Sequence, residues 1–250
     1  MTDGAGKRRI GVLGGMGPEA TVLFMSRVIK LTPAQDDRDH VPLIVDDNTQ
    51  VPSRIKALIE KTGEDPAPVL AEMARRLEAA GAEALAMPCN TAHHFAPAIV
   101  GAVDIPFLNM VDLAVERVAP LAQADKRVGL LASPAVRLTG LFDRAFAERG
   151  ISTLYPADDD RLLAAICAIK VDSTEASAVR TLRQATTELI GKGTDVLVIA
   201  CSEFSIIADT VESSIAVVDT IDVLAQAAID FASHEDGGSS DTDGHWRMSA

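Results

Sequence analysis

The stretch GAEALAMPC, residues 81–89, decides the fold because its pattern returns as GTDVLVIAC at residues 193–201. In both copies a glycine precedes an apolar run typical of a buried strand, and a cysteine follows that run. A second matching pair, RIGVL at 9–13 and RVGLL at 127–131, lies upstream of each copy. A repeat of this kind predicts two related α/β units with open sheets.

Each repeated cysteine, Cys89 and Cys201, stands where a predicted strand ends and a predicted helix begins. Open α/β sheets bind their ligands at this end of the strands, and a helix N-terminus stabilises a thiolate. A free cysteine is also common as a small buried hydrophobe, and a duplicated fold would duplicate it. The polar pairs that follow, Asn90-Thr91 and Ser202-Glu203, favour a functional site over a core position.

Two thiols that face one ligand from opposite sides suit a particular reaction. One thiolate removes a proton from a carbon, and the other thiol returns a proton to the opposite face, which inverts a stereocentre. The sequence therefore predicts paired acid–base catalysis by Cys89 and Cys201 if the two units enclose a common cleft.

The length of 250 residues is sufficient for two small domains with buried cores. We expect a first α/β domain over 8–119, a second over 120–219, and a helix over 220–232 that packs back on the first. The polar segment 233–250 is rich in Gly, Ser and Asp and is predicted to be a disordered tail.

The net charge of −13 disfavours nucleic acid and anionic membranes as partners. No apolar run is long enough to span a bilayer, and no apolar segment of a secretory signal follows the charged N-terminus. Three distant cysteines form no disulfide framework, so a reducing cytoplasm is the expected location.

A glycine-rich turn, GGMGP at 14–18, follows the first predicted strand and opens a helix. Residues 15–20 also fit the dinucleotide fingerprint G-x-G-x-x-A. Pro18 has no N–H to offer a phosphate, and the pair Asp46-Asp47 comes later than the usual ribose-binding acid. A carboxylate-binding turn or a purely structural turn is therefore favoured over a dinucleotide site.

Arg54, Cys167 and His93 are further candidates for site residues. Arg54 is able to bind a carboxylate with two hydrogen bonds, although a surface arginine at the start of a helix is the simpler interpretation. Cys167 lies in an apolar helical stretch and is predicted to belong to the core. Cys89 and His93 do not make a metal site, because no second group has ligand spacing.

Taken together in order, the segments 14–18, 48–54, 88–93 and 201–203 make the chain resemble the aspartate/glutamate racemase family over residues 9 to about 232. The resemblance implies two α/β domains related by a pseudo-twofold axis, with the active site between them. It also implies a cofactor-independent amino-acid racemase that uses neither pyridoxal phosphate (PLP) nor metal. A small amino acid, aspartate or glutamate, is the implied substrate, and a homodimer is the expected assembly.

The resemblance implies a role for each matching residue. Cys89 and Cys201 would be the opposed acid–base groups, and Asn90, Thr91 and Ser202 would hold the α-carboxylate. Arg54 would meet the side-chain carboxylate. The remaining substrate contacts would come from Met16, Asn48, Ser133, Thr139, Lys170 and Glu203.

Two departures from the family pattern stand out. Ser202 replaces the usual threonine and keeps a hydroxyl, whereas Pro134-Ala135-Val136 replaces a common Thr-Gly-Thr, so that Ser133 and Thr139 would have to supply hydroxyls. Three alternatives stay open: a hydantoin racemase, an enzyme like maleate isomerase, and a non-catalytic carboxylate-binding protein. A malonate decarboxylase of the same superfamily needs only one cysteine and is disfavoured.

Overall fold

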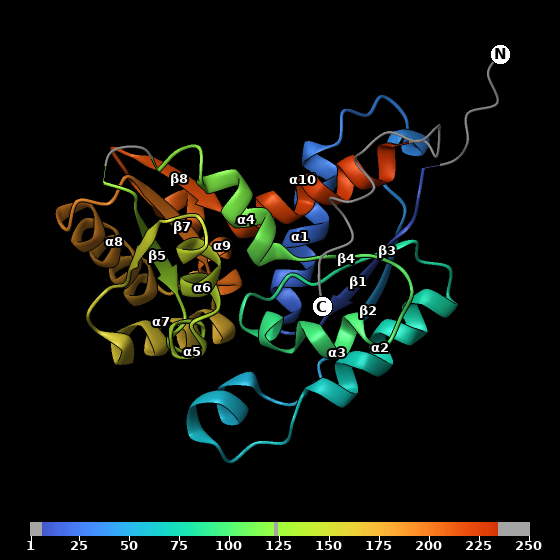
Figure 1. Ribbon diagram of the computed structural model, residues 1–250, viewed down its shortest axis with the longest axis horizontal. Helices are drawn as coiled ribbons and strands as arrows, with labels where there is room; N and C mark the ends of the chain where they lie inside the picture. Colours follow the sequence, from blue (N-terminus) through green and yellow to red (C-terminus); the bar gives the residue numbers. More distant parts are fainter. Residues whose placement is uncertain (1–6, 123–124, 235–250) are drawn as a thin grey trace.

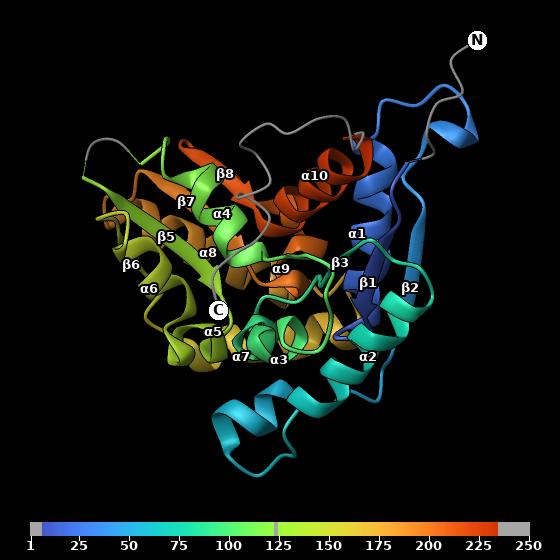
Figure 2. The same cartoon turned by 45° about the vertical axis from the view of Figure 1, so that its right-hand side comes forward.

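Two parallel four-stranded sheets frame the molecule in the computed structural model (Figures 1 and 2). The structure describes residues 7–122 and 125–234, so most of the predicted tail lies outside the described residues. The first sheet has the order β2-β1-β3-β4 and contains β1 (Ile10–Gly14), β2 (Leu43–Asp47), β3 (Ala84–Ala86) and β4 (Phe107–Leu108). The second has the order β6-β5-β7-β8 and contains β5 (Arg127–Ala132), β6 (Ser152–Leu154), β7 (Val196–Ala200) and β8 (Ala216–Asp219).

The repeated segments become equivalent strands of the two sheets. Ile10 pairs in parallel register with Ala84 in the first sheet, and Val128 pairs with Val196 in the second. Both sheets have the same strand order, counted from the start of each repeat. The predicted fold class, two similar open-sheet α/β domains, is confirmed.

Helices cover both faces of each sheet. They are α1 (Pro18–Leu31), α2 (Ala67–Ala79), α3 (Ala96–Val100), α4 (Met110–Val118), α5 (Pro134–Thr139), α6 (Leu141–Ala147), α7 (Asp159–Val171), α8 (Ala176–Gly191), α9 (Ser202–Ile206) and α10 (Thr220–Ser233). Short helical turns are η1 (Asp37–Asp39), η2 (Lys56–Glu60), η3 (Thr91–Phe95) and η4 (Ala208–Thr210). Within the described residues, none of the helices is both long and apolar enough to cross a membrane.

The strand side chains alternate between two helix layers. Ile10 and Val12 of β1 lie in one apolar core with α1 and α10, whereas Leu13 belongs to the core on the opposite face with α2. The second sheet repeats this arrangement: Val198 of β7 packs toward α4 and α6, and Ile199 toward α7 and α8. Strands buried on both faces read as continuous apolar runs, which is why these segments carry so few polar residues.

Helices α4 and α10 cross between the two halves. Helix α4 follows the first sheet in sequence, but its residues Val111 and Val115 lie in the core of the second sheet. Helix α10 follows the second sheet, but Leu224 and Ala228 lie in the core of the first. The two helices lie side by side between the sheets (Figures 1 and 2). The boundaries 8–119 and 120–219 stay a prediction, since each half supplies a helix to the other.

Two local expectations differ from the structure. The apolar spacing predicts one helix over 136–149, but it is broken at Gly140, whose φ of +60° separates α5 from α6. The sequence also predicts a helix over 55–61, which is instead a single π-helical turn, η2, followed by Lys61 at φ +56°. Positive φ favours glycine at the first break, whereas at Lys61 a non-glycine residue adopts it.

Candidate active site

A small cavity lies between the two sheets and is lined by both repeated cysteines. Its volume is about 40 Å³, enough for only a few water molecules. Of the residues predicted from the sequence, the lining contains Met16, Arg54, Cys89, Asn90, Thr91, Ser133, Lys170, Cys201, Ser202 and Glu203. The remaining lining residues are Ser53, Ile55, Ile59, Ala135, Leu163 and Ile166.

The cysteines reach this cavity from equivalent positions. Cys89 follows the end of β3 and Cys201 follows the end of β7, and both side chains are buried, with 5% and 3% of their surface exposed. In each copy the backbone N–H three residues later, of Ala92 or of Phe204, stabilises the thiolate. The repeat has therefore placed two thiols with similar backbone support at one site.

The two thiols differ in their charged neighbours. Burial raises the pKa of Cys89, the Arg54 guanidinium lowers it, and the Glu203 carboxylate raises it by a smaller effect than that of Arg54. Burial also raises the pKa of Cys201, to well above its ordinary value, and there the Glu203 carboxylate raises it further. A cation favours a thiolate and an anion disfavours it, so Cys89 is the thiol that loses its proton more readily.

Glu203 connects Cys201 to a cation. Its Oε2 accepts hydrogen bonds from the Cys201 thiol at 3.3 Å and from the Ser202 hydroxyl at 3.5 Å. Its Oε1 lies 3.2 Å from Nζ of Lys170, near the C-terminal end of α7. Glu203 is only 8% exposed, and this ion pair compensates part of the cost of burying its charge.

Hydroxyl groups from the two halves meet at the cavity wall. Oγ1 of Thr91 lies 3.1 Å from Oγ of Ser133, close enough for a hydrogen bond between them. Ser133 is also the N-cap of α5 and accepts a hydrogen bond from Val136 N–H at 3.3 Å. Thr91 belongs to the loop of the first cysteine, so this contact joins the two halves beside it.

Arg54 is held by its own loop. Its Nη1 donates to the backbone carbonyls of Val51 and Pro52 at 3.3 and 3.0 Å, which leaves other guanidinium N–H groups for a ligand. Ile55 and Ile59 follow it along the same segment and line the cavity together with Leu163 and Ile166 of α7. This wall is apolar, and sequence reasoning did not single it out.

Two predicted site residues are not part of the cavity lining formed by the described residues. Oδ1 of Asn48 accepts a hydrogen bond from Gln50 N–H at 3.0 Å, and the Asn48 backbone packs against Gly15. A Cβ on Gly15 would lie 2.3 Å from the Asn48 carbonyl carbon, and the φ of +85° also requires glycine there. Thr139 donates to the Val136 carbonyl at 2.9 Å, in the last turn of α5.

The glycine-rich turn at residues 14–18 is hydrogen-bonded to a side chain of the helix that follows it. Gly15 N–H donates to Oγ1 of Thr21 at 2.9 Å, and Pro18 begins α1. An N–H engaged in this way does not face a phosphate, which weakens the dinucleotide interpretation further.

His93 holds the Cys89 segment by hydrogen bonds, a role that the sequence did not predict. Its Nδ1 lies 2.9 Å from the Cys89 carbonyl, and its Nε2 lies 3.1 Å from Met110 N–H. An amide can only donate and a carbonyl can only accept, so Nδ1 carries the proton and the ring is neutral. Burial lowers the pKa of His93 to about 4. The spacing of four residues after Cys89 was the available signal.

Within residues 7–122 and 125–234, no three His, Cys, Asp or Glu side chains gather in a way that would hold a metal ion. The prediction that Cys167 belongs to the core is wrong. Its side chain is exposed, because α7 buries the opposite face through Leu162, Ile166 and Ile169.

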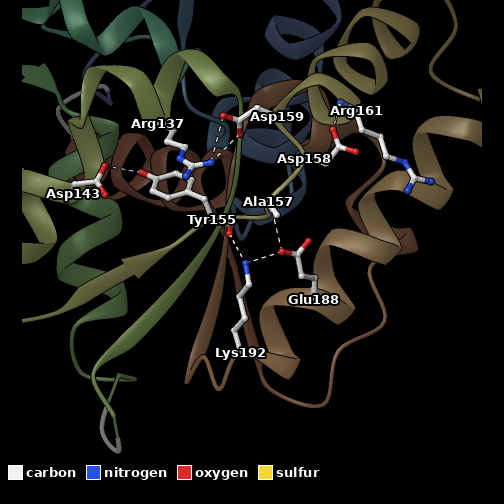
Figure 3. A network of polar contacts seen from close by, with 9 residues as sticks. All are labelled: Arg137, Asp143, Tyr155, Ala157, Asp158, Asp159, Arg161, Glu188 and Lys192. Atoms are coloured by element: carbon white, nitrogen blue, oxygen red, sulfur yellow. Dashed lines mark hydrogen bonds and ion pairs between the residues drawn. The ribbon is translucent and has the colours of Figure 1, made fainter.

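A polar network fixes α5 relative to α7, which carries Lys170. Arg137 of α5 pairs with Asp159 at 3.2 Å, at the start of α7, and lies over the ring of Tyr155 (Figure 3). The Tyr155 hydroxyl donates to Asp143 at 2.7 Å. The network therefore joins α5 and α7, two of the helices of the second half that line the cavity.

Comparison with known proteins connects this chain to a family. A sequence model described as "Asp/Glu/Hydantoin racemase" matches residues 13–228. The broad specificity amino-acid racemase RacX of Bacillus subtilis (strain 168) is 24% identical over 224 residues, which cover 88% of this chain and 96% of that protein.

Solved structures show the same similarity. The aspartate racemase of Picrophilus torridus superposes with a TM-score of 0.76 at 31% identity, covering 90% of this chain and 94% of that one. An aspartate racemase homologue from Pyrococcus horikoshii OT3 superposes with a TM-score of 0.69 at 19% identity, covering 91% and 100%. The second similarity, at its lower identity, supports the fold alone.

Proposed function

The chain belongs to the Asp/Glu/hydantoin racemase family of isomerases, and on that premise we propose that it is a PLP-independent amino-acid racemase with Cys89 and Cys201 as its acid–base pair. One observation carries the proposal: the two thiols line the same cavity from equivalent strand ends of two similar domains. A thiol on each side of a ligand is the arrangement that proton transfer to opposite faces of one carbon requires.

The proposed step is a 1,1-proton transfer. The Cys89 thiolate takes the Cα proton of one enantiomer, the C–H electron pair stays on the substrate as a carbanion, and the Cys201 thiol gives its proton to the other face. The product has inverted configuration, and the enzyme is left with a Cys89 thiol and a Cys201 thiolate. The same path in reverse converts the other enantiomer.

The carbanion next to a carboxylate needs stabilisation by fixed donors, which act most strongly in a site closed to water. Thr91, Ser133 and Ser202 supply hydroxyls at the cavity wall. Arg54 adds positive charge, which suits a second carboxylate and supports aspartate or glutamate as the substrate, whereas the charge of Lys170 is balanced by Glu203.

The experiment uses purified protein in D2O without added cofactor. L-aspartate, L-glutamate and a panel of neutral amino acids are incubated separately, and Cα deuterium incorporation is followed by NMR together with optical rotation. We expect exchange and racemisation with a dicarboxylic amino acid. No exchange with any of them contradicts the proposal, and hydantoins and maleate then test the two alternative activities.

Single-cysteine variants test the assignment of the residues. Cys89→Ala and Cys201→Ala are each expected to lower racemisation by at least about 100-fold, since a general acid or base contributes about that much or more. Cys167→Ala is the matched control, because that thiol is exposed on α7. Full activity in either of the first two variants contradicts the two-base scheme.

A further inference from the structure

We propose that Thr220 is a positioning residue that fixes the Asn90 side-chain amide, so that its nitrogen faces Thr220 and its oxygen is left to accept a hydrogen bond from the α-ammonium group of the substrate. The ammonium part of this inference rests on the proposed racemase function. The Thr220 part concerns the free protein and stands separately.

The hydrogen-bond directions follow from the Thr220 hydroxyl. Oγ1 of Thr220 lies 3.0 Å from the Ile199 carbonyl and 3.0 Å from the Asn90 amide nitrogen. A carbonyl only accepts, so the single hydroxyl proton goes to Ile199. The hydroxyl is then an acceptor toward Asn90, and only the amide NH2 end can face it. A flipped amide would place two acceptors against each other.

This arrangement leaves the Asn90 oxygen for a ligand. Asn90 lines the cavity and is 1% exposed, and its Oδ1 has no hydrogen-bond partner among the described residues. Buried carbonyl oxygens in proteins are nearly always paired, so an unpaired one at a cavity wall indicates a missing donor. An α-ammonium group donates hydrogen bonds, whereas an α-carboxylate can only accept them. The Asn90 side-chain oxygen is therefore suited to the ammonium group, since a carboxylate offers it no donor.

Thr220 lies where its hydroxyl can contact the cysteine-bearing segments of both halves. Thr220 is completely buried and is the first residue of α10, at the point where the chain leaves the second sheet. Asn90 follows Cys89, and Ile199 lies in β7 two residues before Cys201. One hydroxyl thus contacts the segments that carry both thiols.

The first measurement concerns the free protein. The Asn90 side-chain NH2 signals of 15N-labelled protein are identified by their loss in Asn90→Asp, and their hydrogen exchange is measured. We expect exchange at least about tenfold slower than for a solvent-exposed asparagine, slow exchange retained in Thr220→Ser, and the protection lost in Thr220→Val. An unprotected amide in the wild type, or full protection in Thr220→Val, overturns the role of Thr220.

The second measurement compares two ligands by calorimetry: L-aspartate, and succinate, which lacks the amine. We expect the wild type to bind L-aspartate about tenfold or more tightly than succinate, as a charge-assisted hydrogen bond predicts. Thr220→Val should reduce this ratio, and Thr220→Ser should keep it. Thr186→Val is the matched control, since Thr186 is also a buried threonine, on α8.

The two parts fail in different ways. Equal affinity for both ligands in an enzyme that racemises aspartate overturns the ammonium contact alone. Absence of any Cα exchange contradicts the proposed function. The hydrogen exchange of the Asn90 amide then still shows whether Thr220 holds the Asn90 side chain in place. Should Thr220→Val fail to fold, Thr220→Ala, which also removes the hydroxyl, gives the same decision.

Discussion

The thiol of Cys201 donates a hydrogen bond of 3.3 Å to Oε2 of Glu203, two residues further along the chain. The other carboxylate oxygen of Glu203 pairs with Lys170 at 3.2 Å. An anion next to a thiol favours the protonated form, and this is the state in which Cys201 would have to begin in order to donate a proton. Glu203 also raises the pKa of Cys89, so its hydrogen bond to the Cys201 thiol and the opposing effect of Arg54 on Cys89 are what distinguish the two cysteines.

Glu203→Gln is expected to lower the pKa of the Cys201 thiol, because it removes the negative charge that adds to the effect of burial. The thiolate absorbance near 240 nm, followed against pH in a Cys89→Ala, Cys167→Ala background, measures this shift. Glu188→Gln, which alters a surface ion pair with Lys192, serves as the control. An unchanged or higher pKa of Cys201 in Glu203→Gln contradicts the assigned interaction.

Arg54→Ala is expected to weaken binding of L-aspartate by about tenfold or more, because a charge-assisted pair with the side-chain carboxylate is lost. The same change removes the cation that lowers the pKa of Cys89, so the thiolate should form at higher pH. Calorimetric titration measures the first effect. Arg76→Ala, which breaks a pair with Asp46, is the control. An affinity equal to that of the wild type would show that Arg54 does not bind the ligand.

His93 predicts a pH dependence of stability. Its pKa is about 4 in the folded protein and about 6.5 when unfolded, so only the unfolded chain takes up this proton between these values. The contribution of His93 is fully present above pH 6.5 and is lost as the pH falls toward 4, at a cost of about 3 kcal/mol in the free energy of unfolding. Urea unfolding of the wild type and His93→Gln across this range measures the difference.

The wild type has to be compared with His93→Gln because Asp219 changes the stability with pH in the opposite direction. Burial raises the pKa of Asp219 to about 6, so its effect on stability improves as the pH falls from 6 toward 4. Both proteins contain Asp219, so its contribution cancels in the comparison. His94→Gln is the comparison at the neighbouring exposed position, where burial also lowers the histidine pKa, so a smaller effect in the same direction is expected. A stability difference independent of pH would mean that His93 is not held neutral.

The repeat made the fold predictable. A glycine, an apolar run and a cysteine at matching positions determined the strands β3 and β7 and the place of each thiol at a strand end. Apolar runs bounded by turn residues have few alternative structures, so strand positions followed closely. Helix ends followed less closely: Gly140 interrupts one expected helix, and the helix after Arg54 is only a π-helical turn.

Contacts between residues far apart in the chain could not be predicted from the sequence. Asn90 and Thr220 are separated by 130 residues, and nothing in the local pattern of either indicates the partner. The prediction for Cys167 was wrong for a different reason. Helix α7 is apolar on most sides, so its composition did not reveal which side faces the core. Asn48 belongs to the predicted loop, but its side chain bonds within that loop and not to the cavity.

The central claim is that each cysteine serves one face of the substrate, and the most direct test is the fate of the Cα hydrogen at early conversion in D2O. The amino acid with the fastest exchange is incubated as the pure L-enantiomer, and the reaction is stopped after a few per cent of product has formed. Two opposed bases predict that the D-enantiomer carries deuterium at Cα, delivered by a thiol already exchanged with solvent, while the remaining L-enantiomer keeps its hydrogen. A D-enantiomer that retains the original hydrogen would mean that one group serves both faces, and would contradict the account.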